Sequence, residues 1–133
     1  MNKELTIKSI PESITAVENF IEEVCTHYDV GPDVYGNILI SLTEAVNNAI
    51  IHGNKNDEVK DVVVSQNLDT SIKSLVFKVN DEGNGFDYNN LPDPTAPENL
   101  TMIGGRGVFL IKQLADFVVF SNDGSTIELQ FKV

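Results

Sequence analysis

Three groups of residues in this sequence have the types and spacing that could do chemistry. The first is Glu44, Asn48 and His52, which are four residues apart and rise along one stripe of a helix, about 40° from one to the next. An acid, an amide and an imidazole offer donors suited to a hard cation and a general base. A solvated helix face is the alternative, because amphipathic helices normally carry polar stripes. The neighbours Ala45 and Asn47, in place of lysines and glutamates, favour the chemical interpretation.

The second group is residues 81–85, with the sequence Asp-Glu-Gly-Asn-Gly, which follows a strand-like run ending at Val79. Aspartate and glycine are ordinary turn residues, so a structural turn is a sufficient explanation. A carboxylate at the end of a strand can also accept a hydrogen bond from an exocyclic amine, and glycines let a flat ligand approach the backbone. Asp81 is the acid that we assign to such a contact.

The third group, residues 104–107 with the sequence Gly-Gly-Arg-Gly, opens a helical pattern. Backbone N–H groups at a glycine-rich helix N-terminus form an anion site, which the helix dipole reinforces. Flexible glycines at the start of a helix explain the same residues without a ligand. The segment does not match the P-loop pattern, and no dinucleotide-binding strand order precedes it, so the two commonest nucleotide folds fit poorly.

Hydrophobic periodicity indicates the elements that must position these groups. A weakly alternating segment at residues 5–10 predicts a short edge strand. Ser13 is expected to cap an amphipathic helix that runs to the Gly-Pro break at residues 31–32. A second helix is predicted over residues 33–53, where Gly53 is in position for a C-terminal cap.

The second half of the chain contains β-branched and aromatic runs that predict strands. The expected elements are strands at 59–68 and 72–79 with a turn at 69–71, a helix at 108–115, and strands at 117–121 and 127–133. Residues 83–107 show no periodicity and predict a long loop, and loops of more than about 15 residues in a compact domain are usually lids or binding loops. This order predicts a two-layer α/β sandwich with a mixed, mostly antiparallel sheet and the helices on one face.

Length, charge and composition limit the function classes. The chain has 133 residues, and we treat residues 1–133 as one domain. Its net charge of −11 disfavours nucleic acid as a direct partner. The lone Cys25 is expected to pack as a small hydrophobe. Because no apolar run suits a signal sequence or a membrane span, we expect a cytoplasmic protein without a membrane partner.

In this order, the three groups resemble the GHKL superfamily of ATPases, which includes gyrase and the histidine kinases. Residues 44–53, EAVNNAIIHG, and residues 104–111, GGRGVFLI, are similar to the corresponding boxes of the bacterial anti-sigma-factor serine kinases. The resemblance spans nearly the whole chain. It implies a Bergerat-type fold, an ATP lid at about residues 86–104, and ATP and Mg²⁺ as cofactors.

The resemblance also implies roles for single residues. Glu44 is the general base, Asn48 binds Mg²⁺ and contacts the nucleotide, and Asp81 reads the adenine amine. The other residues implied in the base pocket and at the lid hinge are Gly83, Gly85, Gly105, Arg106, Gly107, Val108 and Thr126, with Ser125 as an alternative hydroxyl. His52 is equally well explained as a cap for the last carbonyls of its helix.

The function that the resemblance implies is an ATP-dependent serine protein kinase that acts as an anti-sigma factor. Such a protein holds a sigma factor, phosphorylates a small anti-anti-sigma antagonist and forms a homodimer. A histidine-kinase module would need a phosphoacceptor helix, for which 133 residues are expected to leave no room. The acceptor is therefore expected on a separate partner protein.

One departure keeps a second function open. Similar kinases often carry an arginine just before the glycine pair, where this chain has Met102-Ile103, and the nearest basic residue is Arg106. This departure weakens the expectation of phosphoryl transfer more than that of ATP binding. The alternative is an ATP-binding regulatory module that sequesters a partner without phosphoryl transfer, and a domain with an empty, degenerate pocket is a third possibility.

Overall fold

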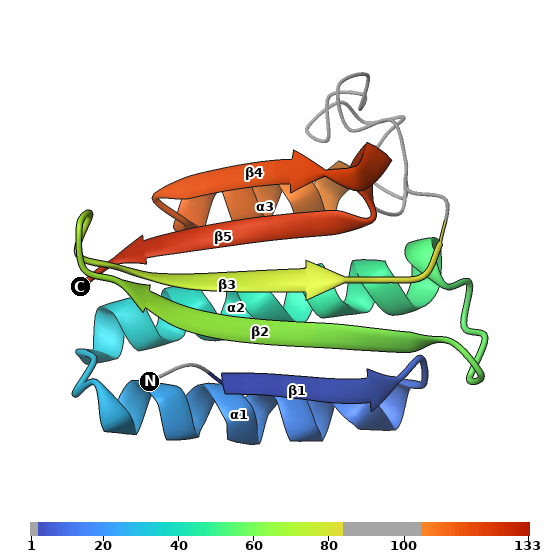
Figure 1. Cartoon of the computed structure of the whole chain (residues 1–133), viewed down its shortest axis with the longest axis horizontal. Helices are drawn as coiled ribbons and strands as arrows, with labels where there is room; N and C mark the ends of the chain where they lie inside the picture. The colour runs from blue at the N-terminus through green and yellow to red at the C-terminus, as the bar shows by residue number, and fades with distance from the viewer. Residues whose placement is uncertain (1–2, 84–104) are drawn as a thin grey trace.

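The computed structural model of the protein describes residues 3–83 and 105–133. Within them, five strands form one sheet in the order β1-β2-β3-β5-β4, and each neighbouring pair is antiparallel (Figure 1). The strands are β1 (Lys3–Lys8), β2 (Asp61–Asp69), β3 (Ser74–Asn80), β4 (Phe117–Ser121) and β5 (Thr126–Lys132). The sheet was expected to be mixed and mostly antiparallel, and all of its described pairings are antiparallel.

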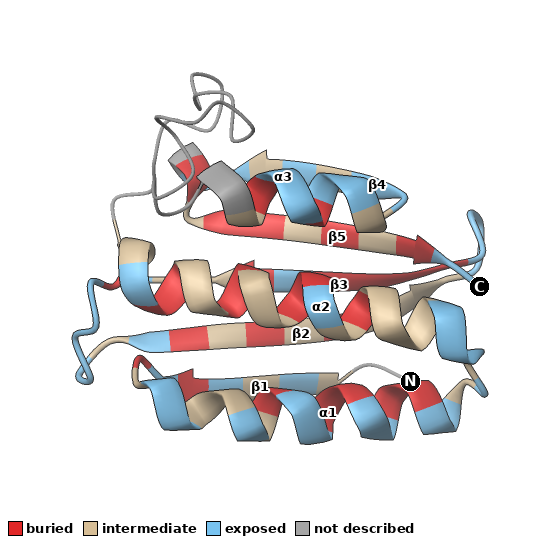
Figure 2. Ribbon diagram, turned by 180° about the vertical axis from the view of Figure 1, so that it is seen from behind, coloured by how far each residue is buried: buried red, intermediate tan, exposed pale blue. Residues whose placement is uncertain are grey.

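Helices cover one face of this sheet, as Figure 2 shows from the side opposite to Figure 1. They are α1 (Ile14–His27), α2 (Pro32–Asn48) and α3 (Gly105–Leu114). Shorter helical turns are Pro11–Ser13, Ala49–Gly53 and Asn122–Gly124. This is the predicted two-layer α/β sandwich. In the described part of the chain, no helix has the length and apolar character needed to cross a membrane.

The core lies between α2 and the central strands, because each presents apolar side chains at the period of its own element. On α2, Ile38 and Leu42 are fully buried four residues apart. On the facing side of β3 and β5, the rings of Phe77 and Phe131 meet edge to face at 6.1 Å between centroids. With this side of α2 buried against the sheet, another side is left to face α3, which packs beside it.

The beginning of α1 differs from the expectation, because Ser13 does not cap the helix with its side chain. Pro11 starts a 3₁₀ turn that continues directly into α1, and the N–H of Ser13 donates to the Ile10 carbonyl at 3.1 Å. Ser13 therefore already has a helical backbone, with φ of −65° and ψ of −17°. An N-cap needs an extended backbone, so the predicted cap is wrong.

The residues predicted to begin two of the strands lie in turns instead. Val59 is 85% exposed and lies in a turn, so β2 begins at Asp61. The turn after β2 includes Ile72, which was expected in a strand. Asp69 shapes this turn, because its Oδ1 accepts the N–H of Ser71 at 3.0 Å and the Ser71 hydroxyl at 2.6 Å.

Two other expectations concern α1 and the long loop. Cys25 is buried, and burial raises the pKa of its thiol to about 11, so it packs as a neutral hydrophobe at physiological pH. Most of the expected loop at 83–107 lies outside the described residues, as does the proposed lid at 86–104. The helix after it begins at Gly105 rather than at residue 108.

Candidate functional site

The end of α2, the end of β3 and the beginning of α3 lie at the same end of the sandwich (Figures 1 and 2). These three segments carry the three groups of residues singled out in the sequence. The antiparallel pairing of β3 with β5 also brings the start of β5 to this end, where Asn80 pairs with Thr126. The fold thus gathers residues from distant parts of the chain into one region.

Glu44 and Asn48 face the first turn of α3. A Cβ atom added to Gly107 would lie 3.0 Å from Glu44 Oε2 and 3.0 Å from Asn48 Nδ2. The acid and the amide are therefore side by side against the backbone of α3, and both residues are partly buried. A solvated stripe would not place them in contact with another helix. Gly107 permits this contact because it has no side chain.

His52 leaves the stripe formed by Glu44 and Asn48. Residues Ala49–Gly53 form a π turn, in which the N–H of Asn54 donates to the Ala49 carbonyl at 2.8 Å. This wider turn rotates His52 away from the direction that an α-helix would give it. The His52 Nε2 is buried and has no hydrogen-bond partner among the described residues, so the structure does not support a capping role. Burial lowers the pKa of the imidazole, which favours its neutral form.

Gly53 is placed by the approach of Asp81 and not by a helix cap. The residue that ends the turn is Asn54, whose backbone is right-handed at φ −92°. A Cβ atom on Gly53 would lie 2.7 Å from Asp81 Oδ1 and would overlap the rest of the carboxylate. A Cβ atom on Gly83 would in turn overlap the Gly53 carbonyl. Two glycines therefore allow the turn after β3 to press against the end of α2.

The Asp81 carboxylate is a half-buried acceptor with one oxygen already in use. Its Oδ1 accepts the N–H of Gly83 at 2.8 Å, and no described group donates to Oδ2. The backbone N–H of Asp81 donates to the Ser125 carbonyl at 2.9 Å. Burial raises the pKa of the carboxyl, while the Gly83 N–H and the charge of Lys60 act in the opposite direction. An amine donor is the kind of group that would satisfy the remaining oxygen.

Thr126 is close to Asp81 through the pairing of β5 with β3. Its hydroxyl donates to Asn80 Oδ1 at 2.5 Å and accepts from Asn122 Nδ2 at 2.9 Å. The Ser125 hydroxyl instead donates to the Asn122 carbonyl at 2.8 Å. Both hydroxyls therefore have partners within the protein, and Thr126 is buried next to the strand that leads into Asp81.

The remaining expected site residues are only partly described. Gly105 and Gly107 lie in the first turn of α3, and Val108 is 2% exposed, so its side chain packs in the interior. The side chain of Arg106 lies outside the described part of the structure, as does the whole of Gly85. The segment with Met102-Ile103 is outside it as well.

Asn54 belongs to this region although no sequence motif indicates it. Its side chain is buried and binds Ser9, Asp61 and the backbone of Glu82. The signal that marks it is an asparagine directly after the glycine that ends a helix, where side-chain amides often bind nearby backbone groups.

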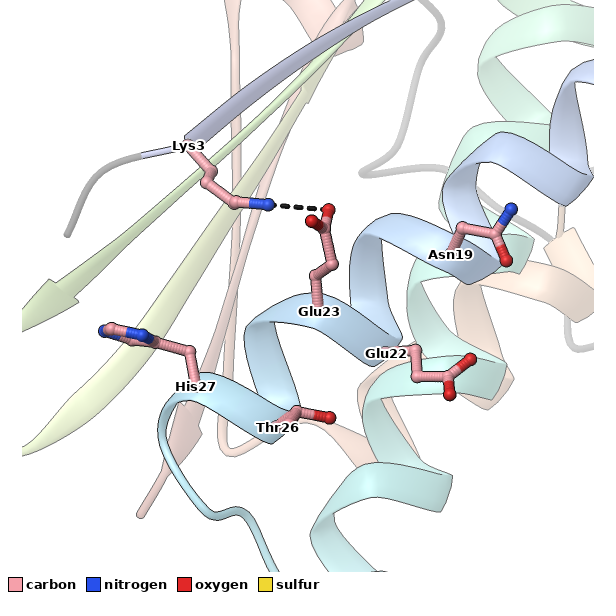
Figure 3. A pocket seen from close by; sticks show the side chains of 6 residues that line it. All are labelled: Lys3, Asn19, Glu22, Glu23, Thr26 and His27. Atoms are coloured by element: carbon pink, nitrogen blue, oxygen red, sulfur yellow. Dashed lines mark hydrogen bonds and ion pairs between the residues drawn. The ribbon is translucent and has the colours of Figure 1, made fainter.

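A groove of about 540 Å³ on α1 is separate from this region. Figure 3 shows its lining residues, among which Lys3 Nζ lies 2.6 Å from Glu23 Oε2. It lies where β1 begins and α1 ends, at the opposite end of the sandwich from Asp81 (Figure 1). The groove therefore does not contribute to the candidate site.

Comparisons with known proteins concern the family and the fold of the chain. The model of a family described as the histidine kinase-like ATPase domain matches residues 7–131. No curated protein matches the chain. The chain is similar in fold to the crystal structure of the RsbU and RsbW domains of Rv1364c from Mycobacterium tuberculosis, with a TM-score of 0.69 and 16% sequence identity. The similarity covers 99% of this chain and 32% of the Rv1364c chain, so this chain spans about a third of the length of the Rv1364c chain.

The close packing at Gly53 predicts opposite effects for two glycine substitutions. Gly53→Ala should lower the free energy of unfolding by roughly 1–3 kcal/mol, because the new methyl group would overlap the Asp81 carboxylate. Gly36→Ala is the matched control in α2, where no described atom lies within 4 Å of an added Cβ. It should raise that free energy by roughly 0.5–1 kcal/mol. Urea denaturation measures both, and a Gly53→Ala protein as stable as the wild type would contradict the packing.

The buried Asp81 carboxylate predicts a stability that depends on pH. Because its pKa is raised in the folded protein, the charged form destabilises the fold above that pKa, and the cost disappears as the pH falls to the ordinary value for aspartate. Asp81→Asn keeps an oxygen for the Gly83 N–H and removes the charge. Its melting temperature at pH 7 should exceed that of the wild type by roughly 2–4 °C, the scale of one small stabilising change.

The difference in melting temperature between Asp81→Asn and the wild type should shrink as the pH falls from above the raised pKa of Asp81 to the ordinary pKa of aspartate. Asp69 is the control of opposite sign, because hydrogen bonding to the Ser71 hydroxyl lowers the pKa of its carboxyl. Asp69→Asn should therefore give no rise in the melting temperature at pH 7. Circular dichroism melts at several pH values compare the proteins, and an Asp81→Asn protein that melts lower at pH 7 would refute the assigned burial cost.

Proposed function

The chain belongs to the histidine kinase-like ATPase domain family, and within this family we propose that it is an ATP-dependent serine protein kinase that acts as an anti-sigma factor. In this proposal the protein works in a partner-switching pathway. It holds a sigma factor inactive and phosphorylates a small anti-anti-sigma antagonist. The observation that carries the proposal is the approach of Glu44 and Asn48 to the first turn of α3.

Asp81 supports the adenine part of this proposal. Its Oδ1 is held by the Gly83 N–H, and Oδ2 is the acceptor for the exocyclic amine of adenine. Thr126 lies on the neighbouring strand and adds a second polar group beside the base. The glycine contact between the turn and the end of α2 fixes the carboxylate at the strand end, so the base is read from a rigid element.

Asn48 and the start of α3 support the phosphate part. The Asn48 amide and the Glu44 carboxylate offer hard oxygen donors, which fit Mg²⁺ together with phosphate oxygens and water. Asn48 is the residue proposed to hold the ion, and Mg²⁺ when bound neutralises phosphate charge. The first turn of α3 offers its backbone N–H groups and the positive end of the helix dipole to the phosphates.

Glu44 has the role of general base in this mechanism. The serine hydroxyl of the partner attacks the γ-phosphorus, and a bond forms between the serine oxygen and this phosphorus. The bond between the γ-phosphorus and the oxygen that bridges it to the β-phosphorus breaks, which releases ADP. Glu44 accepts the serine proton as this happens. Because Glu44 is one helical turn from Asn48, the base and the ion-binding amide are fixed relative to each other.

The partners and the assembly are part of the proposal. We expect a homodimer in the cytoplasm, without direct contact to nucleic acid, in keeping with the net charge of −11. A second candidate function is an ATP-binding module that sequesters its partner without phosphoryl transfer. Met102-Ile103 favours it, because the arginine that often precedes the glycine pair in similar kinases is absent at these positions.

Both candidate functions predict binding of ATP with Mg²⁺. Calorimetry on the folded protein should detect heat on titration with ATP and Mg²⁺, and less affinity when the ion is replaced by a chelator, because Asn48 and the phosphates share it. The Asn48→Ala protein should lose this dependence on Mg²⁺. Absence of binding by the folded wild type would exclude both functions.

Glu44→Gln separates the kinase from the binding module. With radiolabelled ATP and a purified anti-anti-sigma antagonist, the wild type should place label on a serine of the antagonist. Glu44→Gln should retain ATP affinity and slow this transfer by about 100-fold or more, the contribution of a general base. Glu22→Gln on the outer face of α1 is the control and should transfer at the wild-type rate.

The pattern of results assigns the function. Undiminished transfer by Glu44→Gln would remove Glu44 from the role of base. ATP binding by the wild type without any transfer to the antagonist would leave the binding module as the function.

A further inference from the structure

We infer that Asn54 is a positioning residue for the adenine contact and that it sets the preference for adenine over guanine. It does so by holding the turn that carries Asp81. The inference rests on the proposed function, in which Asp81 reads the base.

The Asn54 side chain uses both of its donor hydrogens and its oxygen in hydrogen bonds inside the protein. Asn54 is 1% exposed, and its Nδ2 donates to Ser9 Oγ at 2.8 Å and to the Asp61 carbonyl at 2.9 Å. Its Oδ1 accepts the N–H of Glu82 at 2.7 Å. These partners come from three segments: the residue after β1, the first residue of β2 and the turn after β3. All three lie at the same end of the sheet (Figure 1).

Only one orientation of this amide satisfies these partners. If the amide were turned over, its NH₂ group would face the N–H of Glu82, and two donors would oppose each other. Its oxygen would then face the Asp61 carbonyl, so that two acceptors would be opposed. A buried amide with a single satisfied orientation is a rigid support, since each unmade bond carries a desolvation cost.

Asn54 supports the turn through the backbone of Glu82, the residue between Asp81 and Gly83. Three successive N–H groups of this turn are bound: that of Asp81 to the Ser125 carbonyl, that of Glu82 to Asn54, and that of Gly83 to the Asp81 carboxylate. The last of these bonds orients the carboxylate itself. Rotation of the Glu82 peptide would therefore turn the acceptor oxygens of Asp81 away from their present direction.

Two further contacts brace the same support. The Ser9 hydroxyl, which accepts from Asn54, donates to the Lys60 carbonyl at 2.7 Å, and Ser9 is fully buried. The Glu82 carboxylate accepts the N–H of Asp61. The turn is thus tied to β2 twice, once through the Glu82 side chain and once through Asn54, and of these two ties the one through Asn54 binds the backbone of the turn.

The direction of the Asp81 carboxylate decides which base is accepted. Adenine presents an amine at C6, which donates to a carboxylate, whereas guanine presents a carbonyl there, which would face it as a second acceptor. A site built around a buried hydrogen-bonding group discriminates strongly against a ligand that cannot pair with it. A carboxylate that is free to turn away loses the favourable bond to adenine and the repulsion of guanine together.

The experiment compares the affinities for ATP, GTP and inorganic tripolyphosphate by calorimetry. Asn54→Ala should weaken ATP binding by roughly tenfold and reduce the ratio of ATP to GTP affinity by a similar factor, as expected for one lost buried hydrogen bond. Its affinity for tripolyphosphate should stay within about twofold of the wild-type value, because the phosphate contacts are on α2 and α3. A general loss of structure would weaken all three ligands alike.

Ser9→Ala is the matched control. It removes another buried partner of Asn54 and lowers stability, but it leaves the bond to Glu82 in place. Its ratio of ATP to GTP affinity should stay within about twofold of the wild-type value, because the turn keeps its backbone support. Thermal melts of each variant separate the loss of stability from the loss of base preference.

Asn54→Asp keeps the inference testable if Asn54→Ala does not fold. It retains an oxygen for the Glu82 N–H and loses both donors, so it should be less stable yet keep the preference for ATP. The inference is overturned by a folded Asn54→Ala with the wild-type preference, or by a folded Asn54→Asp without it. Failure of the wild type to bind ATP would instead overturn the proposed function.

Discussion

The contact between Gly53 and the turn after β3 is the constraint on which the candidate site depends. Neither Gly53 nor Gly83 can carry a side chain there, because an added Cβ would overlap the Asp81 carboxylate in one case and the Gly53 carbonyl in the other. This contact joins the π turn that follows α2 to the turn that follows β3. It sets how closely the helix with Glu44 and Asn48 approaches the strand with Asp81.

Helix α2 serves both the core and the site, and its two sides are separated by ordinary helical periodicity. Ile38 and Leu42 are buried, which fixes the rotation of the helix about its axis. That rotation turns Glu44 and Asn48 toward α3, where Gly107 leaves room for them. The π turn at Ala49–Gly53 then ends the periodicity, delivers Gly53 to the turn after β3 and removes His52 from the stripe.

The region holds its polar groups at some cost to stability. Burial raises the pKa of Asp81, and the His52 Nε2 is buried without a hydrogen bond to any described residue. The Gly83 N–H and the charge of Lys60 compensate this burial of Asp81 only in part, because the net shift of its pKa is upward. The buried hydrogen bonds of Asn54 offset part of this cost and also restrict the turn to one geometry. Acids whose pKa is shifted by burial are common at sites that bind a ligand.

The two-layer architecture could be predicted from the sequence, because hydrophobic periodicity is a local property of each element. The sequence also predicted that Glu44 and Asn48 share one side of a helix. The caps at Ser13 and Gly53 were predicted wrongly, and the position of Asn54 after Gly53 did not by itself reveal its role, since the role of each depends on segments distant in the chain. The approach of Gly53 to Asp81, the departure of His52 from the stripe and the bonds of Asn54 to Ser9 and Glu82 become visible in the folded structure. These contacts are set by how the helices pack on the sheet, and helix and strand periodicity carries no information about that packing.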